Sequence, residues 1–162
     1  MVNNGAHHSI GSWAGYGAAL WALIFALLHL VWAAGWYVGL EQEKARKAFD
    51  KTWFQVYDLL VAGMCVLAVP VALALVQPWG RRLPRWLVGL LAWAGTTLLV
   101  LRGGGTIVQT VYFLAVGRFV PQWMMLWELW FYIGAVLFFL STWRFWRALP
   151  TESAIEPRND QN

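Results

Sequence analysis

The chain contains four long apolar segments separated by short polar ones. As an α-helix, about 20 apolar residues cross the hydrocarbon core of a bilayer, so each segment is long enough to do so. The pattern predicts an all-α membrane protein, a four-transmembrane-helix bundle with up-down-up-down topology. The predicted spans cover residues 16–40, 54–76, 86–113 and 122–142.

The polar segments set the predicted domain boundaries. We expect an N-terminal tail at residues 1–15, a transmembrane domain at 16–147 and a disordered C-terminal tail at 148–162. The stretch 41–51 carries charges of both signs, which indicates a solvated linker or a short surface helix. The short connection 77–85 contains two prolines, a glycine and three arginines, and it should make the second and third spans antiparallel neighbours.

The third apolar segment is too long for a simple span. It continues from Trp86 to Val116, and a helix of that length would measure about 45 Å, against a hydrocarbon core of about 30 Å. Such a helix must tilt, break or end early. Arg102 and the glycines Gly103–Gly105 interrupt it, which favours a helix kinked or broken at these glycines. The alternative is a helix that ends near Arg102, with the remainder lying on the membrane surface.

Ionisable side chains inside the spans are the candidate functional positions. Burying such a group in hydrocarbon costs on the order of several kcal/mol unless it is paired or hydrated. His29 lies near the exit of its span, whereas Asp58 and Glu128 follow the entries of theirs, and Arg102 lies in the later half of the third span. In an up-down-up-down bundle these positions all fall in the same half of the membrane. The candidate ligand-binding residues are His29, Trp32, Asp58, Arg102, Gln109 and Glu128.

Helical spacing gives these side chains a direction as well as a depth. We expect the stripes to face the bundle interior and to form a polar pocket with aromatic walls. The stripes are Trp21, Phe25, His29, Trp32 and Trp36 in the first span, Asp58, Ala62 and Cys65 in the second, and Gly95, Leu98, Arg102, Gly105, Thr106 and Gln109 in the third; in the fourth span Glu128 is flanked by Met124, Phe131 and Tyr132.

Each of these residues also has a purely structural interpretation. Arg102 with Asp58 or Glu128 can be an ion pair that only joins helices, and His29 can be a neutral interhelical hydrogen-bonding group. The two carboxylates can cap their helices or reach headgroup water, and tryptophan stripes often serve packing or lipid contact. Gly35 and Gly39 have the spacing typical of close helix pairs.

Composition supports the membrane assignment and excludes several kinds of chemistry. The chain is 60% hydrophobic and 12% charged, whereas soluble domains carry about 25% charged residues. The net charge of +4 lies in short clusters that fit lipid headgroups, and no motif indicates a nucleic-acid partner. Cys65 is the single cysteine, which excludes an internal disulfide. His29 is the single intramembrane histidine, so bis-histidine haem is excluded, and we expect no metal and no cofactor.

Charge asymmetry between the loops decides the predicted orientation only narrowly. We expect a multi-pass protein of the cell membrane with both termini cytoplasmic. This orientation places Arg81, Arg82, Arg85, Arg144, Arg147 and Arg158 inside and Lys44, Arg46, Lys47, Lys51 and Arg118 outside.

Two sequence elements resemble a known family. They are H-L-V-W-A-A-G at His29–Gly35 and W-E-L-W-F-Y-I-G-A-V-L-F at Trp127–Phe138. Together with Arg102 and the glycine after it, they are similar to an uncharacterised family of small four-helix bacterial integral membrane proteins. Members share H-x-x-W-A-x-G in helix one, Arg-Gly in helix three and an acidic residue opening helix four, here Glu128. The resemblance covers about residues 25–147 and implies the topology but no reaction, and the loop 41–51 is longer than in that pattern.

Three functions agree with this pattern. The first is a protein that binds or transports a small amphipathic or lipid-like molecule in a half-membrane polar pocket. The second is a structural or assembly protein whose buried charges pair helices or recruit a partner membrane protein or a second copy. The third, ranked last, is an intramembrane acid–base enzyme such as an isomerase, with Glu128 or Asp58 as acid or base and His29 as proton partner. The sequence predicts no particular ligand.

Overall fold

The computed structural model describes the backbone of residues 6–118 and 122–147, and it is all-α. Its elements are α1 (Ala6–Ala33), α2 (Gln42–Phe49), α3 (Thr52–Ala74), the 3₁₀ turn η1 (Pro78–Arg82), α4 (Arg85–Ala115) and α5 (Gln122–Arg147). By length and composition, α1, α3, α4 and α5 can each cross a membrane. The predicted four-helix membrane fold is confirmed, and the chain is a multi-pass membrane protein in contact with lipid.

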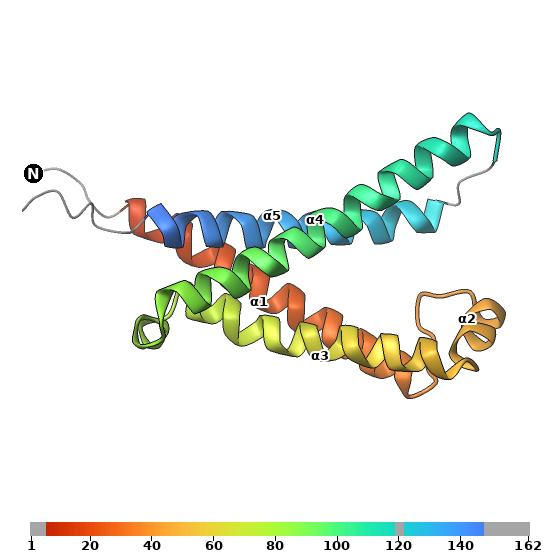
Figure 1. Cartoon of the computed structure of the whole chain (residues 1–162), viewed down its shortest axis with the longest axis horizontal. Coiled ribbons are helices and arrows are strands. Elements are labelled where there is room, and N and C mark those ends of the chain that lie inside the picture. The colour runs from red at the N-terminus through yellow and green to blue at the C-terminus, as the bar shows by residue number, and fades with distance from the viewer. Residues whose placement is uncertain (1–5, 119–121, 148–162) are drawn as a thin grey trace, which may run out of the picture.

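The four long helices are arranged as two antiparallel pairs (Figure 1). Helix α1 packs along α3, and α5 packs along α4. The two pairs meet mainly through α1 and α5, while α4 contacts α3 less extensively. Figure 1 shows α4 crossing the bundle obliquely, so that its last turns lie far from α3.

The core lies where α1 meets α3 and α5. Trp21 and Phe25 of α1, Cys65 of α3 and Phe138 of α5 are all buried in it. Buried alanines at positions 18, 22 and 26 of α1 let the neighbouring helices approach closely. Large apolar side chains such as Leu60 point outward, as expected of a surface that faces lipid.

Helix α4 continues without interruption through Gly103–Gly105, so of the predicted kink or break the break is wrong, and so is the alternative of a helix that ends near Arg102. None of the three glycines has a positive φ. In hydrocarbon an unwound backbone has no water to satisfy its polar groups, which favours an intact helix even at glycine. Figure 1 shows α4 crossing the other long helices obliquely. A tilted helix can be longer than the hydrocarbon core is thick.

Helix α1 differs from the predicted first span at both ends. It begins at Ala6 rather than at residue 16, and it ends at Ala33 rather than at residue 40. Gly35 and Gly39 have φ values of 90° and 76°, a left-handed conformation that ends the helix and forms a turn. The spacing of these glycines had suggested close helix packing, but the structure places them in a turn after the helix.

The charged loop after the first span contains a short helix, as one of the two alternatives predicted. Helix α2 spans Gln42–Phe49 and buries Ala45 and Phe49, while most of its other side chains are exposed. The C-terminal tail predicted at 148–162 lies outside the described residues.

Candidate functional site

The closest contact between ionisable side chains joins α1 to α3. His29 Nδ1 lies 2.6 Å from Asp58 Oδ1, and the two residues are only 7% and 2% exposed. At this distance the simplest assignment is that Nδ1–H donates to the carboxylate. The other heteroatoms of the pair, His29 Nε2 and Asp58 Oδ2, are buried and have no hydrogen-bond partner among the described residues. From the sequence, Asp58 and Glu128 were both considered as partners of His29, and the structure brings Asp58 to it.

Aromatic rings surround His29. The imidazole lies edge-on to Phe25 and Trp32, with ring centroids 4.6 Å and 4.8 Å away. Trp21 is also buried, so four of the five predicted stripe residues on α1 face the interior. The fifth, Trp36, is exposed because the helix has already ended.

A second ion pair joins α4 to α5. Arg102 Nη1 lies 3.7 Å from Glu128 Oε1, and it donates a hydrogen bond to Thr106 Oγ1 on its own helix. The guanidinium also stacks over the ring of Phe131, 4.6 Å from its centroid. The Arg102 side chain is 49% exposed and that of Glu128 is 15% exposed. Of the two partners considered for Arg102 from the sequence, the structure brings Glu128 to it.

The two ionisable pairs are separate sites. Phe25 contacts His29 on one side and Phe131 on the other, with 5.3 Å between the two phenyl centroids. Phe131 in turn lies beneath Arg102. Two aromatic rings therefore stand between the pairs, and the candidate residues do not line one common pocket. Within the described ranges, no three His, Cys, Asp or Glu side chains are grouped as metal ligands.

The predicted inward stripe of α4 is mostly wrong. Of its six members only Thr106 is buried; Leu98 is 52% exposed, and Gln109 is exposed and joins neither pair. The face that packs against neighbours is instead made of small and medium residues, namely Val88, Gly89, Ala92, Thr96, Gly103 and Thr106. Gly89 and Gly103 face Trp146 and Tyr132 of α5 closely, which explains why this face turns inward. The sequence interpretation followed the polar residues and overlooked Gly89 and Gly103.

A groove lies between α4 and α5, and we call it the α4–α5 groove. It consists of two neighbouring hollows of about 300 Å³ and 340 Å³ that share Ile107 and Tyr132. The first is also lined by Thr106, Thr110, Val111, Glu128 and Leu129, and the second by Val100, Gly104, Ala135, Val136 and Phe139. The second hollow has only apolar side chains besides the shared tyrosine.

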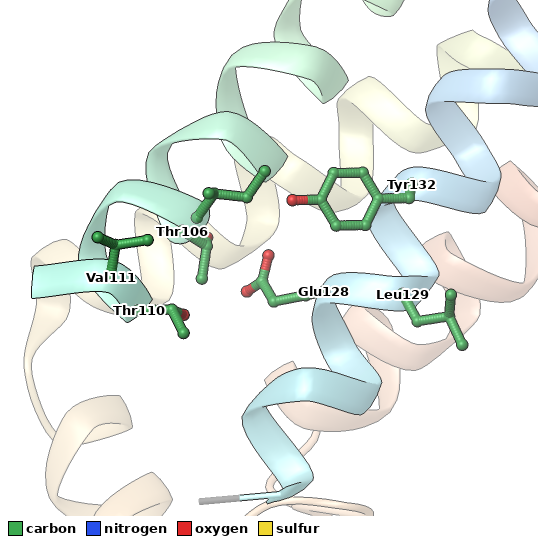
Figure 2. A pocket seen from close by; sticks show the side chains of 7 residues that line it. Thr106, Thr110, Val111, Glu128, Leu129 and Tyr132 are labelled. Carbon is green, nitrogen blue, oxygen red and sulfur yellow. The ribbon is translucent and has the colours of Figure 1, made fainter. Parts of the chain in front are cut away.

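The polar groups of the groove gather in the first hollow. Figure 2 shows the Glu128 carboxylate directed from α5 toward α4, where Thr106 and Thr110 lie. Tyr132 also points at α4, and its hydroxyl donates to Gly103 O at 3.1 Å. Glu128 Oε2 is buried and accepts no hydrogen bond from the part of the chain that the structure describes. This end of the groove can therefore accept a hydrogen bond from a ligand, and the rest can hold a hydrocarbon chain.

Sequence reasoning identified Glu128 and placed Tyr132 beside it, and both line the first hollow. It missed Thr110 and Gly104, which line the groove from the opposite helix. Gly104 was read as part of a helix break, whereas it lines the second hollow. A methyl group built at Gly104 would meet no atom within 4 Å.

Comparison with known proteins identifies a family. Residues 22–140 match the family model described as "Protein of unknown function (DUF3995)". The matched segment contains both ionisable pairs and all residues that line the α4–α5 groove. No curated protein and no solved structure matches this chain.

Proposed function

This chain belongs to the DUF3995 family of proteins of unknown function, and we propose that it binds a small amphipathic, lipid-like molecule in the α4–α5 groove. Membership confirms the resemblance to an uncharacterised family of small four-helix membrane proteins. The family supplies no activity, so the proposal depends on the geometry of the groove.

The observation that carries the proposal is the uneven distribution of polar groups along the groove. Glu128, Thr106 and Thr110 lie in the first hollow, and the second hollow is walled by apolar side chains such as Val136 and Phe139. A molecule with a small polar head and an apolar tail complements this arrangement, because the head finds hydrogen-bonding groups and the tail does not cover polar atoms.

The groove also lies where a lipid-like molecule could enter it from the bilayer. Several of its lining side chains are apolar and more than half exposed, among them Ile107, Val111 and Val136. These exposed side chains indicate that the groove opens on a lipid-facing surface. Lateral entry from the membrane would then require no rearrangement of the four helices.

The buried pair His29–Asp58 favours the structural interpretation for those two residues. It lies in the tight interface of α1 with α3, and neither residue lines the groove. We therefore assign helix pairing to His29 and Asp58, and ligand binding to the groove around Glu128.

Filling the second hollow tests the proposal. We expect Gly104→Leu to place its side chain in the open space at this position and so to displace the tail of a bound molecule. Because no atom opposes the new Cβ, the variant should fold normally. Wild type and variant would be purified in a mild detergent, and the lipids extracted from each would be compared by mass spectrometry. We expect a species near one molecule per protein in the wild type and at least about tenfold less in the variant, a loss of about 1.4 kcal/mol or more in binding free energy.

Gly105→Leu is the matched control. Gly105 is the next residue of the same helix, it also has open space around it, and it does not line the groove. The Gly105→Leu variant should retain the bound species. This result would distinguish a molecule bound in the groove from lipids that merely surround the protein. Identical lipid profiles in the wild type and in Gly104→Leu would refute the proposed function.

A further inference from the structure

The polar end of the groove carries no net charge. Glu128 is the single ionisable carboxylate among the groove-lining residues, and the guanidinium of Arg102 lies 3.7 Å from it. The positive and negative charges therefore balance within the pair. A guest that brought a further charge into these apolar surroundings would leave it without a counter-ion, which is strongly unfavourable.

Hydrogen bonding at this end is partly satisfied by the protein itself. The Thr106 hydroxyl accepts from Arg102 Nη1 and lies within hydrogen-bond distance of Arg102 O, while the Tyr132 hydroxyl gives its proton to Gly103 O. Two groups of the first hollow keep capacity for a guest. They are Glu128 Oε2, a buried acceptor without a hydrogen-bond partner among the described residues, and the hydroxyl of Thr110, which lines the same hollow.

Glu128 Oε2 and the Thr110 hydroxyl are complementary to an uncharged head group that has one hydrogen-bond donor and one hydrogen-bond acceptor. A single alcohol hydroxyl supplies both, because its proton can go to Glu128 Oε2 while its oxygen accepts from Thr110. An ammonium head could donate to Glu128 but would add a positive charge to a neutral pair. A carboxylate head would have no proton to give, and a phosphate monoester has lost most of its second proton near neutral pH. Both anions would be repelled by Glu128.

We infer that the ligand of the α4–α5 groove is an uncharged long-chain alcohol, a fatty or isoprenoid alcohol with one hydroxyl and a hydrocarbon tail. This inference rests on the proposed function of the groove. The hydroxyl lies between Glu128 and Thr110, and the tail follows the apolar hollow past Gly104 toward Phe139. From Thr110 to Val100 the helix rises about 15 Å, a length that a fatty or isoprenoid chain can cover.

Three probes with the same tail test the charge argument. Full-length protein in detergent would be incubated with tritiated 1-hexadecanol, and unlabelled 1-hexadecanol, hexadecylamine or hexadecyl phosphate would compete. We expect the alcohol to compete at least about tenfold better than the cationic amine or the anionic phosphate. Binding of the labelled alcohol should be lost in Gly104→Leu and kept in Gly105→Leu.

Two charge variants should change, in opposite directions, which probe competes best with the labelled alcohol. Glu128→Gln leaves the positive charge of Arg102 unbalanced, so hexadecyl phosphate should become the best competitor. Arg102→Gln leaves Glu128 unbalanced, so hexadecylamine should become the best competitor. A role confined to folding would weaken all three probes together and would not reverse their order.

Thr110→Val keeps the test decisive should a charge variant fail to fold, since it leaves the ion pair in place. We expect it to weaken 1-hexadecanol binding about tenfold while the alcohol stays the preferred probe. Unchanged binding in Thr110→Val, or a wild type that prefers the amine or the phosphate, overturns the inference. So does the absence of saturable alcohol binding in the wild type. The lipid profiles of Gly104→Leu and wild type decide the proposed function separately in each of these cases.

Discussion

Replacing Asp58 by alanine is expected to lower the free energy of unfolding by about 3–5 kcal/mol and to leave most of the protein aggregated after extraction from the membrane. Asp58 is 2% exposed, and its carboxylate bonds His29 Nδ1 across the interface of α1 and α3. The substitution leaves the His29 imidazole buried among aromatic rings without its hydrogen-bond partner. Fluorescence-detected size-exclusion chromatography after heating would measure the change in thermal stability.

Asp50→Ala provides the matched control, because it removes an exposed aspartate from the turn before α3. Its melting temperature should equal that of the wild type. Asp58→Asn should lose less than the alanine variant, since the amide oxygen can still accept from Nδ1–H. If the pair acts as a unit, adding His29→Ala to Asp58→Ala should cost less than the sum of the two single losses. A monodisperse Asp58→Ala with the melting temperature of the wild type would show that the pair does not stabilise the bundle.

The hydropathy pattern was sufficient to predict the number of membrane helices, and up-down-up-down topology placed the ionisable residues at one level. The contact between His29 and Asp58 and that between Arg102 and Glu128 agree with this placement. Depth along a helix follows from counting residues from its end, which needs no knowledge of the neighbours. For this reason the level of a residue could be predicted, although the choice between the two carboxylates as its partner could not.

The orientation of α4 about its axis could not be predicted from its polar residues. Arg102 is amphipathic, so it can extend its guanidinium over Phe131 while its backbone lies beside the packed face. Gly103, one residue later, is the position that contacts α5. The aromatic side chain of the neighbouring helix, here Tyr132, determines which glycine is contacted. The sequence of one helix alone does not reveal this pairing.

The two ionisable pairs belong to different parts of the fold, so we expect substitutions that affect stability to differ from those that affect ligand binding. His29–Asp58 fixes α1 against α3, and Arg102–Glu128 joins α4 to α5 beside the groove. The contacts between the two helix pairs include aromatic ones, as Trp21 stacks on Trp130 and Phe25 meets Phe131. Substitutions at Gly104 or Thr110 should therefore change ligand binding with little effect on the core, whereas substitutions at the α1–α5 contact should unfold the protein.

Gly134 lies at that contact, and Gly134→Ala is expected to cost about 2–4 kcal/mol of unfolding free energy. A Cβ at this position would lie 2.5 Å from Cε2 of Trp21, closer than atoms can approach, so the indole must move. Trp21 cannot move freely, because its Nε1 donates to Trp130 O at 2.9 Å and its ring is packed against Phe25 and Phe138.

The thermal unfolding of Gly134→Ala in detergent should be compared with that of Gly63→Ala. Gly63 is also inside a membrane helix, but a Cβ there meets no atom within 4 Å. The Gly63 variant should match the wild type or gain up to about 1 kcal/mol, because alanine is the better helix former. The difference between the two variants therefore isolates the close approach of α1 and α5. Equal melting temperatures would mean that Trp21 can leave its place without loss, and that the aromatic contact between the two helix pairs is not what holds them together.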